Sequence, residues 1–101
     1  MKLPKIEIDE KLLIQIARNF GVKEMYFFGS VLGGDFNEKS DIDILISFQN
    51  EVHYSFFELF ELREKFKVAL NRSVDLIEKE SLKNPYRRKE ILKTARRIYA
   101  A

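Results

Sequence analysis

Hydrophobic residues recur along the chain with two different spacings. Helical spacing, with apolar side chains three or four positions apart, predicts helices over residues 9–20, 55–70 and 85–99. Short apolar runs bounded by turn residues predict strands over residues 22–28, 41–48 and 73–78. Because strands and helices alternate, we expect one α/β (α+β) domain over residues 1–101, with a small mixed sheet and helices packed mainly on one face.

The second of these strands separates charged from apolar side chains. Asp41 and Asp43 fall on one face, and the other face carries Ile42, Ile44, Ile46 and Phe48. Two carboxylates this close repel each other unless a cation lies between them, and Mg²⁺ binds carboxylate and phosphate oxygens in proteins. On its own, however, such a pair is more typical of a solvated turn.

A Gly-Ser turn follows the first predicted strand, and ten residues separate Ser30 from Asp41. Gly29 can adopt backbone angles closed to other residues and lets a ligand approach the main chain. Ser30 suits the N-cap of a short helix, where free N–H groups favour a phosphate. The turn therefore predicts a phosphate site, although an ordinary strand-to-helix turn can have the same residues.

A third carboxylate interrupts the last predicted strand. Asp75 lies within the apolar run 73–78, where a charge is costly unless it is paired or bound to a ligand. Alone it could form a salt bridge, for example with Arg72. Together with Asp41 and Asp43 it completes a metal-binding triad suited to transfer of a nucleotidyl group from a nucleoside triphosphate.

These residues resemble the signature of the DNA polymerase β nucleotidyltransferase superfamily: Gly-Ser, about ten residues, Asp-x-Asp, and a later Asp on a strand. From about residue 8 onwards the chain is similar to the minimal nucleotidyltransferase (MNT) branch, a polymerase-β-like fold without fingers or thumb. The resemblance implies that Gly29 and Ser30 bind the triphosphate of ATP. It also implies that Asp41, Asp43 and Asp75 are catalytic and bind one or two Mg²⁺ ions, with Asp75 as the base-side carboxylate.

The chain departs from this family pattern at two positions. Family members often carry basic residues one and three positions after the Ser, where this chain has Val31 and Gly33. A positive charge near the phosphates would help to neutralise the transferring group, so we expect the departure to affect the rate and not the fold. Lys39 or Arg72 could supply a charge instead.

The resemblance also implies a partner. MNT proteins resemble antitoxins that pair with helical HEPN toxins, ribonucleases silenced by AMP added to a tyrosine. The first hypothesis is therefore Mg²⁺-dependent transfer of AMP from ATP to a tyrosine of a HEPN toxin. Two alternatives stay open: an MNT-like antitoxin that acts by binding alone, and a nucleotidyltransferase that acts on a small molecule or nucleic acid with a separate substrate-binding subunit.

Composition and charge limit the partners and the cellular location that we expect. The formal net charge is only +2, but residues 83–97 carry seven basic residues against one acidic residue. We do not expect nucleic-acid binding there, because no aromatic stacking pattern accompanies the basic residues. The chain has no Cys, no apolar stretch of transmembrane length and no signal-peptide pattern, so we expect a cytoplasmic protein without membrane contact.

The helix predicted over residues 55–70 is rich in Phe. We expect its aromatic cluster to be part of the core, although Phe57 fits the apolar stripe least well; the cluster comprises Phe56, Phe57, Phe60 and Phe66. Apolar surface left exposed on this helix would mark a protein interface. The sequence leaves open whether the chain forms a homo-oligomer or a hetero-oligomer.

Overall fold

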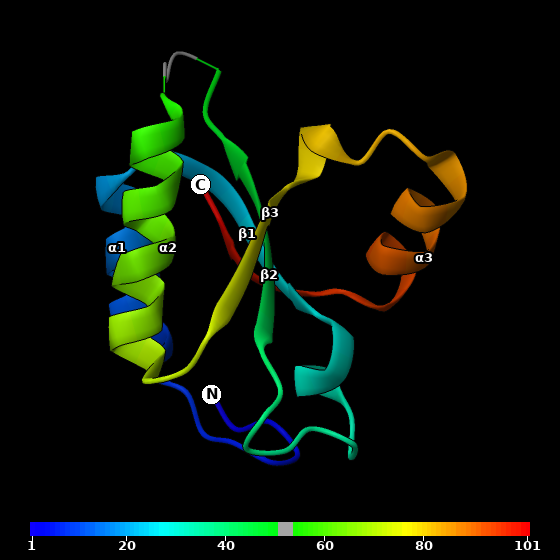
Figure 1. The fold of residues 1–101 in the computed structure, drawn as a ribbon. Coiled ribbons are helices and arrows are strands. Elements are labelled where there is room, and N and C mark those ends of the chain that lie inside the picture. Colours follow the sequence, from blue (N-terminus) through cyan, green and yellow to red (C-terminus); the bar gives the residue numbers. More distant parts are fainter. Residues whose placement is uncertain (51–53) are drawn as a thin grey trace.

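A four-stranded mixed sheet forms the centre of the molecule (Figure 1). The computed structural model describes residues 1–50 and 54–101. The sequence also predicts a loop over residues 49–53, and most of that loop lies outside the described residues. The strand order is β3-β2-β1-β4, with bounds β1 Val22–Phe28, β2 Ile42–Phe48, β3 Val74–Glu78 and β4 Arg96–Ala100. β1 pairs antiparallel with both neighbours, whereas β3 runs parallel to β2. The predicted mixed sheet is confirmed.

Of the three α-helices in residues 1–50 and 54–101, two cover one face of the sheet. α1 (Glu10–Asn19) and α2 (Phe56–Leu70) lie side by side there, while α3 (Pro85–Thr94) lies on the opposite face (Figure 1). Each helix begins at a residue whose side chain caps free backbone N–H groups: Asp9, Ser55 and Asn84. The prediction of helices mainly on one face is therefore confirmed.

Strand alternation divides the apolar residues between two cores. The larger core, between the sheet and the α1–α2 layer, includes Leu13, Met25, Phe27, Ile42, Ile44, Ile46, Leu62 and Phe66. A smaller cluster under α3 is formed by Phe28, Leu45 and Leu82, with Ile91 and Leu92 packed against it. In the described residues no helix is long and apolar enough to span a membrane.

The last predicted helix is too long. α3 ends at Thr94, Ala95 has extended backbone angles (φ −62°, ψ 140°), and residues 96–100 form β4 instead. β4 gives the backbone of β1 a second hydrogen-bonded neighbour and buries Ile98 in the larger core, with 8% of its surface exposed. Both gains depend on residues about 70 positions earlier in the chain, so helical spacing alone gave the wrong end.

The aromatic cluster of α2 is also mostly outside the core. Phe66 is fully buried, but the exposed fractions of Phe56, Phe57 and Phe60 are 80%, 82% and 46%. The stripe of α2 that packs on the sheet runs through Leu59, Leu62, Phe66 and Ala69. The three remaining aromatic side chains are exposed, so the prediction that they form core was wrong.

Candidate functional site

Asp43 and Asp75 lie directly beside each other on neighbouring strands. The parallel register of β2 and β3 pairs their Cα positions, and both side chains lie on the face opposite α1 and α2. Asp41 is exposed and comes just before β2, two residues from Asp43. The structure therefore brings the three predicted carboxylates to one end of two adjacent strands.

The three carboxylates interact through their charges. Burial raises the pKa of Asp43 to about 6, and repulsion from Asp75 and then Asp41 adds to the rise. Neither of the two ion pairs found among the described residues involves any of these carboxylates. A cation at this position would therefore relieve an unfavourable charge.

The three carboxylates are not arranged as a preformed metal-binding site. Within residues 1–50 and 54–101, no group of three acidic, His or Cys side chains is placed to hold one ion. Carboxylate oxygens are nevertheless the donors that Mg²⁺ prefers, and Mg²⁺ usually takes one or two of them together with substrate phosphates. The donor chemistry and the raised pKa of Asp43 fit such an ion, and the Mg²⁺ site stays a prediction.

Gly29 fits against the Asp43 carboxylate. The antiparallel register of β1 and β2 places Phe28 opposite Asp43, so the next residue, Gly29, lies at the carboxylate. Gly29 has φ +74°, and a Cβ atom built on it would overlap Oδ2 of Asp43 and lie 3.2 Å from its Cγ. Both the backbone angle and the close approach require glycine here. The turn predicted to bind phosphate is therefore in direct contact with Asp43, one of the predicted metal ligands.

Ser30 occupies a different place in the turn from the one predicted. A short 3₁₀ helix covers Gly29–Leu32, and its cap residue is Phe28, so Ser30 is the second helical residue and not the N-cap. Its carbonyl accepts a hydrogen bond from the Gly33 N–H at 2.9 Å, which closes the turn. Ser30 is half-buried, whereas Val31 is fully buried in the larger core.

Arg72 has a role that the sequence did not reveal. It was considered as an ion-pair partner of Asp75, but its guanidinium donates to the carbonyls of Asn37 and Ser40, the second at 3.2 Å. The same group lies 4.3 Å from the centre of the Phe36 ring. Arg72 thereby holds the loop that leads into Asp41. The contact links residues more than 30 positions apart, so no local pattern could have shown it.

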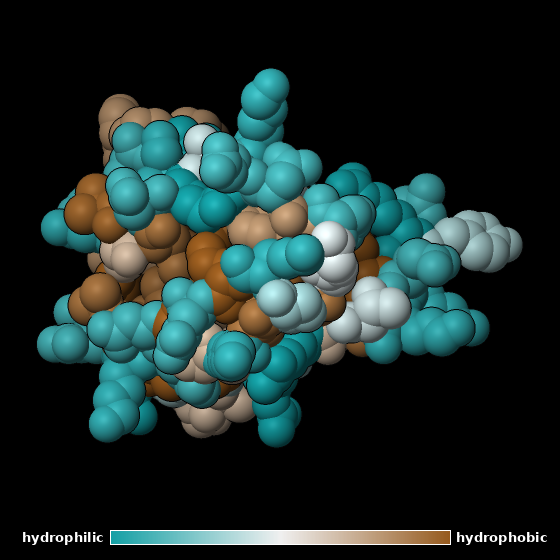
Figure 2. All heavy atoms as spheres, turned by 90° about the horizontal axis from the view of Figure 1, so that it is seen from below, coloured by the Kyte–Doolittle hydropathy of each residue, from teal (hydrophilic) through white to brown (hydrophobic). Residues whose placement is uncertain are grey.

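α3 lies on the same face of the sheet as the carboxylates, and its outer surface is hydrophilic. None of its residues is buried, and its outer surface is covered by polar and charged side chains (Figure 2, right). Its basic residues are therefore solvated, as is usual for a charge run on a helix.

Comparison with known proteins decides the family. The model of the nucleotidyltransferase domain matches residues 10–98, which include every candidate site residue. The chain belongs to the nucleotidyltransferase domain family. A relative, the protein adenylyltransferase MntA of Thermococcus cleftensis, is 40% identical over 70 residues, which cover 69% of each chain. The resemblance to nucleotidyltransferases is confirmed.

Solved structures share the fold of this nucleotidyltransferase. A toxin–antitoxin crystal structure with AMP-PNP superposes with a TM-score of 0.76 at 23% identity, covering 93% of this chain and 75% of that chain. A tri-AMPylated Shewanella oneidensis HEPN toxin in complex with MNT antitoxin gives a TM-score of 0.66 at 22% identity, covering 91% and 70%. These likenesses confirm the predicted minimal nucleotidyltransferase fold.

Proposed function

We propose that this nucleotidyltransferase is a cytoplasmic antitoxin that transfers AMP from ATP to a tyrosine of a HEPN-type toxin in a Mg²⁺-dependent reaction. The observation that carries the proposal is the contact between the Gly29 turn and the Asp43–Asp75 pair, which joins a phosphate-binding turn to paired carboxylates. The adenylyltransferase name of the relative and the MNT–HEPN complex among the structural neighbours support the choice of acceptor.

Asp41, Asp43 and Asp75 would hold one or two Mg²⁺ ions. When bound, the metal supplies positive charge to the triphosphate and to the transferring group. The uncompensated carboxylates supply the oxygen ligands, and Asp43 is half-buried against the turn, which limits the access of water. Gly29 and Ser30 would hold the triphosphate through backbone N–H groups and the Ser30 hydroxyl.

The reaction we propose is a single displacement at phosphorus. The tyrosine oxygen forms a bond to the α-phosphorus of ATP, and the bond from that phosphorus to the pyrophosphate oxygen breaks. Asp75, as the base-side carboxylate, takes the phenol proton, and pyrophosphate leaves. AMP on the acceptor adds negative charge, which would repel an RNA backbone at a ribonuclease site.

One observation favours a second candidate, an antitoxin that acts by binding alone. The side chain of Val31 is buried in the larger core, and Gly33 has no side chain, so neither position supplies a positive charge at the turn. Arg72, one of the two residues considered as a replacement cation, is engaged with the loop before Asp41. Weak neutralisation of the phosphates would slow transfer without preventing a complex.

Incubation with ATP labelled on the α-phosphate distinguishes these candidates. The chain would be mixed with the product of the neighbouring gene, as the candidate acceptor, with Mg²⁺ or with EDTA. Label on the partner protein that requires Mg²⁺ supports adenylylation. An unlabelled but inhibited partner supports the binding-only antitoxin, and label on a non-protein acceptor would replace the proposed substrate.

A further inference from the structure

In the part of the chain that the structure describes, one edge of the sheet pairs with no further strand and is regular. β3 is the terminal strand, and its pairing with β2 runs from Val74 to Glu78 without a register shift. Natural proteins usually protect such edges with bulges or charged side chains, Lys in particular. The opposite edge, β4, has both, since its pairing with β1 shifts register and it begins with Arg96 and Arg97. β3 has no bulge and no basic residue; its charged residues are Asp75 and, at its last position, Glu78.

The backbone groups on the free side of β3 can be identified. The carbonyl of Ser73 accepts a hydrogen bond from the Ile42 N–H at 3.0 Å, so Ser73 points its backbone groups towards β2. Backbone groups alternate in direction along a strand. The N–H and C=O groups of Val74, Leu76 and Glu78 therefore point outward, away from the sheet, where another strand could pair with them.

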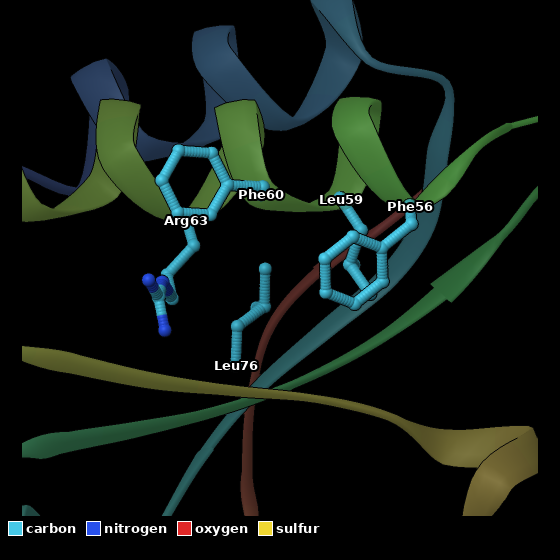
Figure 3. Close-up of a pocket in the computed structure, with 5 residues that line it drawn as sticks. All are labelled: Phe56, Leu59, Phe60, Arg63 and Leu76. Atoms are coloured by element: carbon cyan, nitrogen blue, oxygen red, sulfur yellow. The ribbon is translucent and has the colours of Figure 1, made fainter.

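An apolar cleft lies beside this edge, between α2 and β3. Its volume is about 140 Å³, and it is lined by Phe56, Leu59, Phe60, Arg63 and Leu76. Figure 3 shows Phe56, Leu59 and Arg63 extending from α2 towards Leu76 on β3, whereas the ring of Phe60 lies alongside the helix. The exposed fraction of Phe56 is 80% and that of Phe60 is 46%, which is unusual for side chains of this size.

We propose that this edge and cleft form a two-fold interface with a second copy of the chain. The two β3 strands pair antiparallel about Leu76, which meets Leu76 of the second copy, and Val74 meets Glu78. These pairs use the three residues whose backbone groups point outward. No two like charges are opposed in this register, because Asp75 then meets Ile77 and Glu78 meets Val74.

A second copy explains the two features together. A helical partner could fill the apolar cleft but would leave the outward backbone groups of β3 without partners, whereas an identical strand pairs with them. The two-fold axis stands perpendicular to the sheet, so Leu76 and the aromatic residues of both copies meet on the α2 face. Asp75 lies on the other face, so both carboxylate sites open on the same side of one eight-stranded sheet. The inference does not depend on the proposed function.

The test uses the absence of native Cys, which makes a single introduced thiol specific. In the proposed register the two Cα atoms of residue 76 are roughly 5.5 Å apart, within the range that a disulfide spans. Leu76→Cys should therefore form a disulfide-linked dimer under mild oxidation. Tyr86→Cys is the matched control, because Tyr86 is 83% exposed on α3 and far more open to random collision. Equal crosslinking of the two variants would overturn the proposal.

Light scattering of the unmodified chain gives an independent readout. The expected mass is twice the 12.0 kDa of one chain. Phe56→Ser should raise the dimer dissociation constant by roughly tenfold or more, because Phe56 lines the cleft. Phe57→Ser should leave it unchanged, because the neighbouring Phe57 is equally exposed but outside the cleft. A monomer at all concentrations, or an effect of Phe56→Ser only on a helical partner protein, would refute the second-copy interface.

Discussion

Replacing Asp43 by Asn should stabilise the metal-free protein at neutral pH. The pKa of Asp43 rises from 3.8 to about 6 on folding, because the carboxylate is partly buried beside Asp75 and Asp41. For a group fully shielded from solvent, such a rise in pKa would lower the free energy of unfolding at neutral pH by about 3 kcal/mol. Solvent screens this partly exposed site, so we expect about 1 kcal/mol of stabilisation when Asn removes the charge.

The sign of the pH dependence follows from the raised pKa. Below about pH 4 Asp43 is protonated in both the folded and unfolded states, so the charge penalty is absent. As the pH rises from about 4 to about 6, the free energy of unfolding of the wild type falls, because the unfolded state releases the Asp43 proton at a lower pH than the folded state. The Asn variant has no carboxyl group at this position, so its free energy of unfolding does not fall in this way. The stabilisation should therefore be about 1 kcal/mol at pH 7.5 and a few tenths at about pH 4.5.

Urea unfolding in EDTA, followed by circular dichroism at both pH values, measures this difference. Asp41→Asn is the matched control, because Asp41 is exposed and its removal should change stability less. A destabilised Asp43→Asn variant at neutral pH, or a change in stability that is the same at both pH values, would refute the electrostatic reasoning.

Three further substitutions test the turn and the loop around Asp43. Gly29→Ala should destabilise the fold by about 1–3 kcal/mol, because residue 29 has a positive φ and an added Cβ atom would overlap the Asp43 carboxylate. Gly34→Ala is the control, since nothing lies within 4 Å of a Cβ atom at that position. Urea unfolding compares the two variants, and equal effects would contradict the close packing. Ser30→Ala should weaken binding of a non-hydrolysable ATP analogue with Mg²⁺ by about 1–2 kcal/mol in titration calorimetry; unchanged affinity would leave Ser30 a structural role only. Arg72→Ala should cost about 1–2 kcal/mol of stability through its lost hydrogen bonds to the loop, whereas unchanged unfolding would show that the loop is held by other contacts.

The sequence predicted those parts of the site that depend on local alternation. Strand period two placed Asp41 and Asp43 together, and the isolated charge at Asp75 marked the neighbouring strand. The register that sets Asp43 beside Asp75 was not visible, because it depends on how β2 and β3 pair. The helix start was misplaced by two positions, since the cap of the 3₁₀ helix is Phe28 and not Ser30.

The parts that failed depend on contacts distant in sequence. Arg96–Ala100 became a strand because β1 had a free edge to pair with, and this pairing outweighed the helical pattern. α2 carries apolar residues on more than one face, so counting Phe residues could not decide which ones face the sheet. Their exposure is instead the feature that points to an interface.

The acceptor protein's mass tests the central claim most directly. The product of the neighbouring gene, as the candidate acceptor, would be co-expressed with the wild type and with a variant carrying both Asp41→Asn and Asp43→Asn, and its intact mass and modified residues would be measured. We predict that the partner gains one or more AMP groups on tyrosine with the wild type and none with the variant. An unmodified partner that both proteins inhibit equally would contradict adenylylation and leave binding alone as the function.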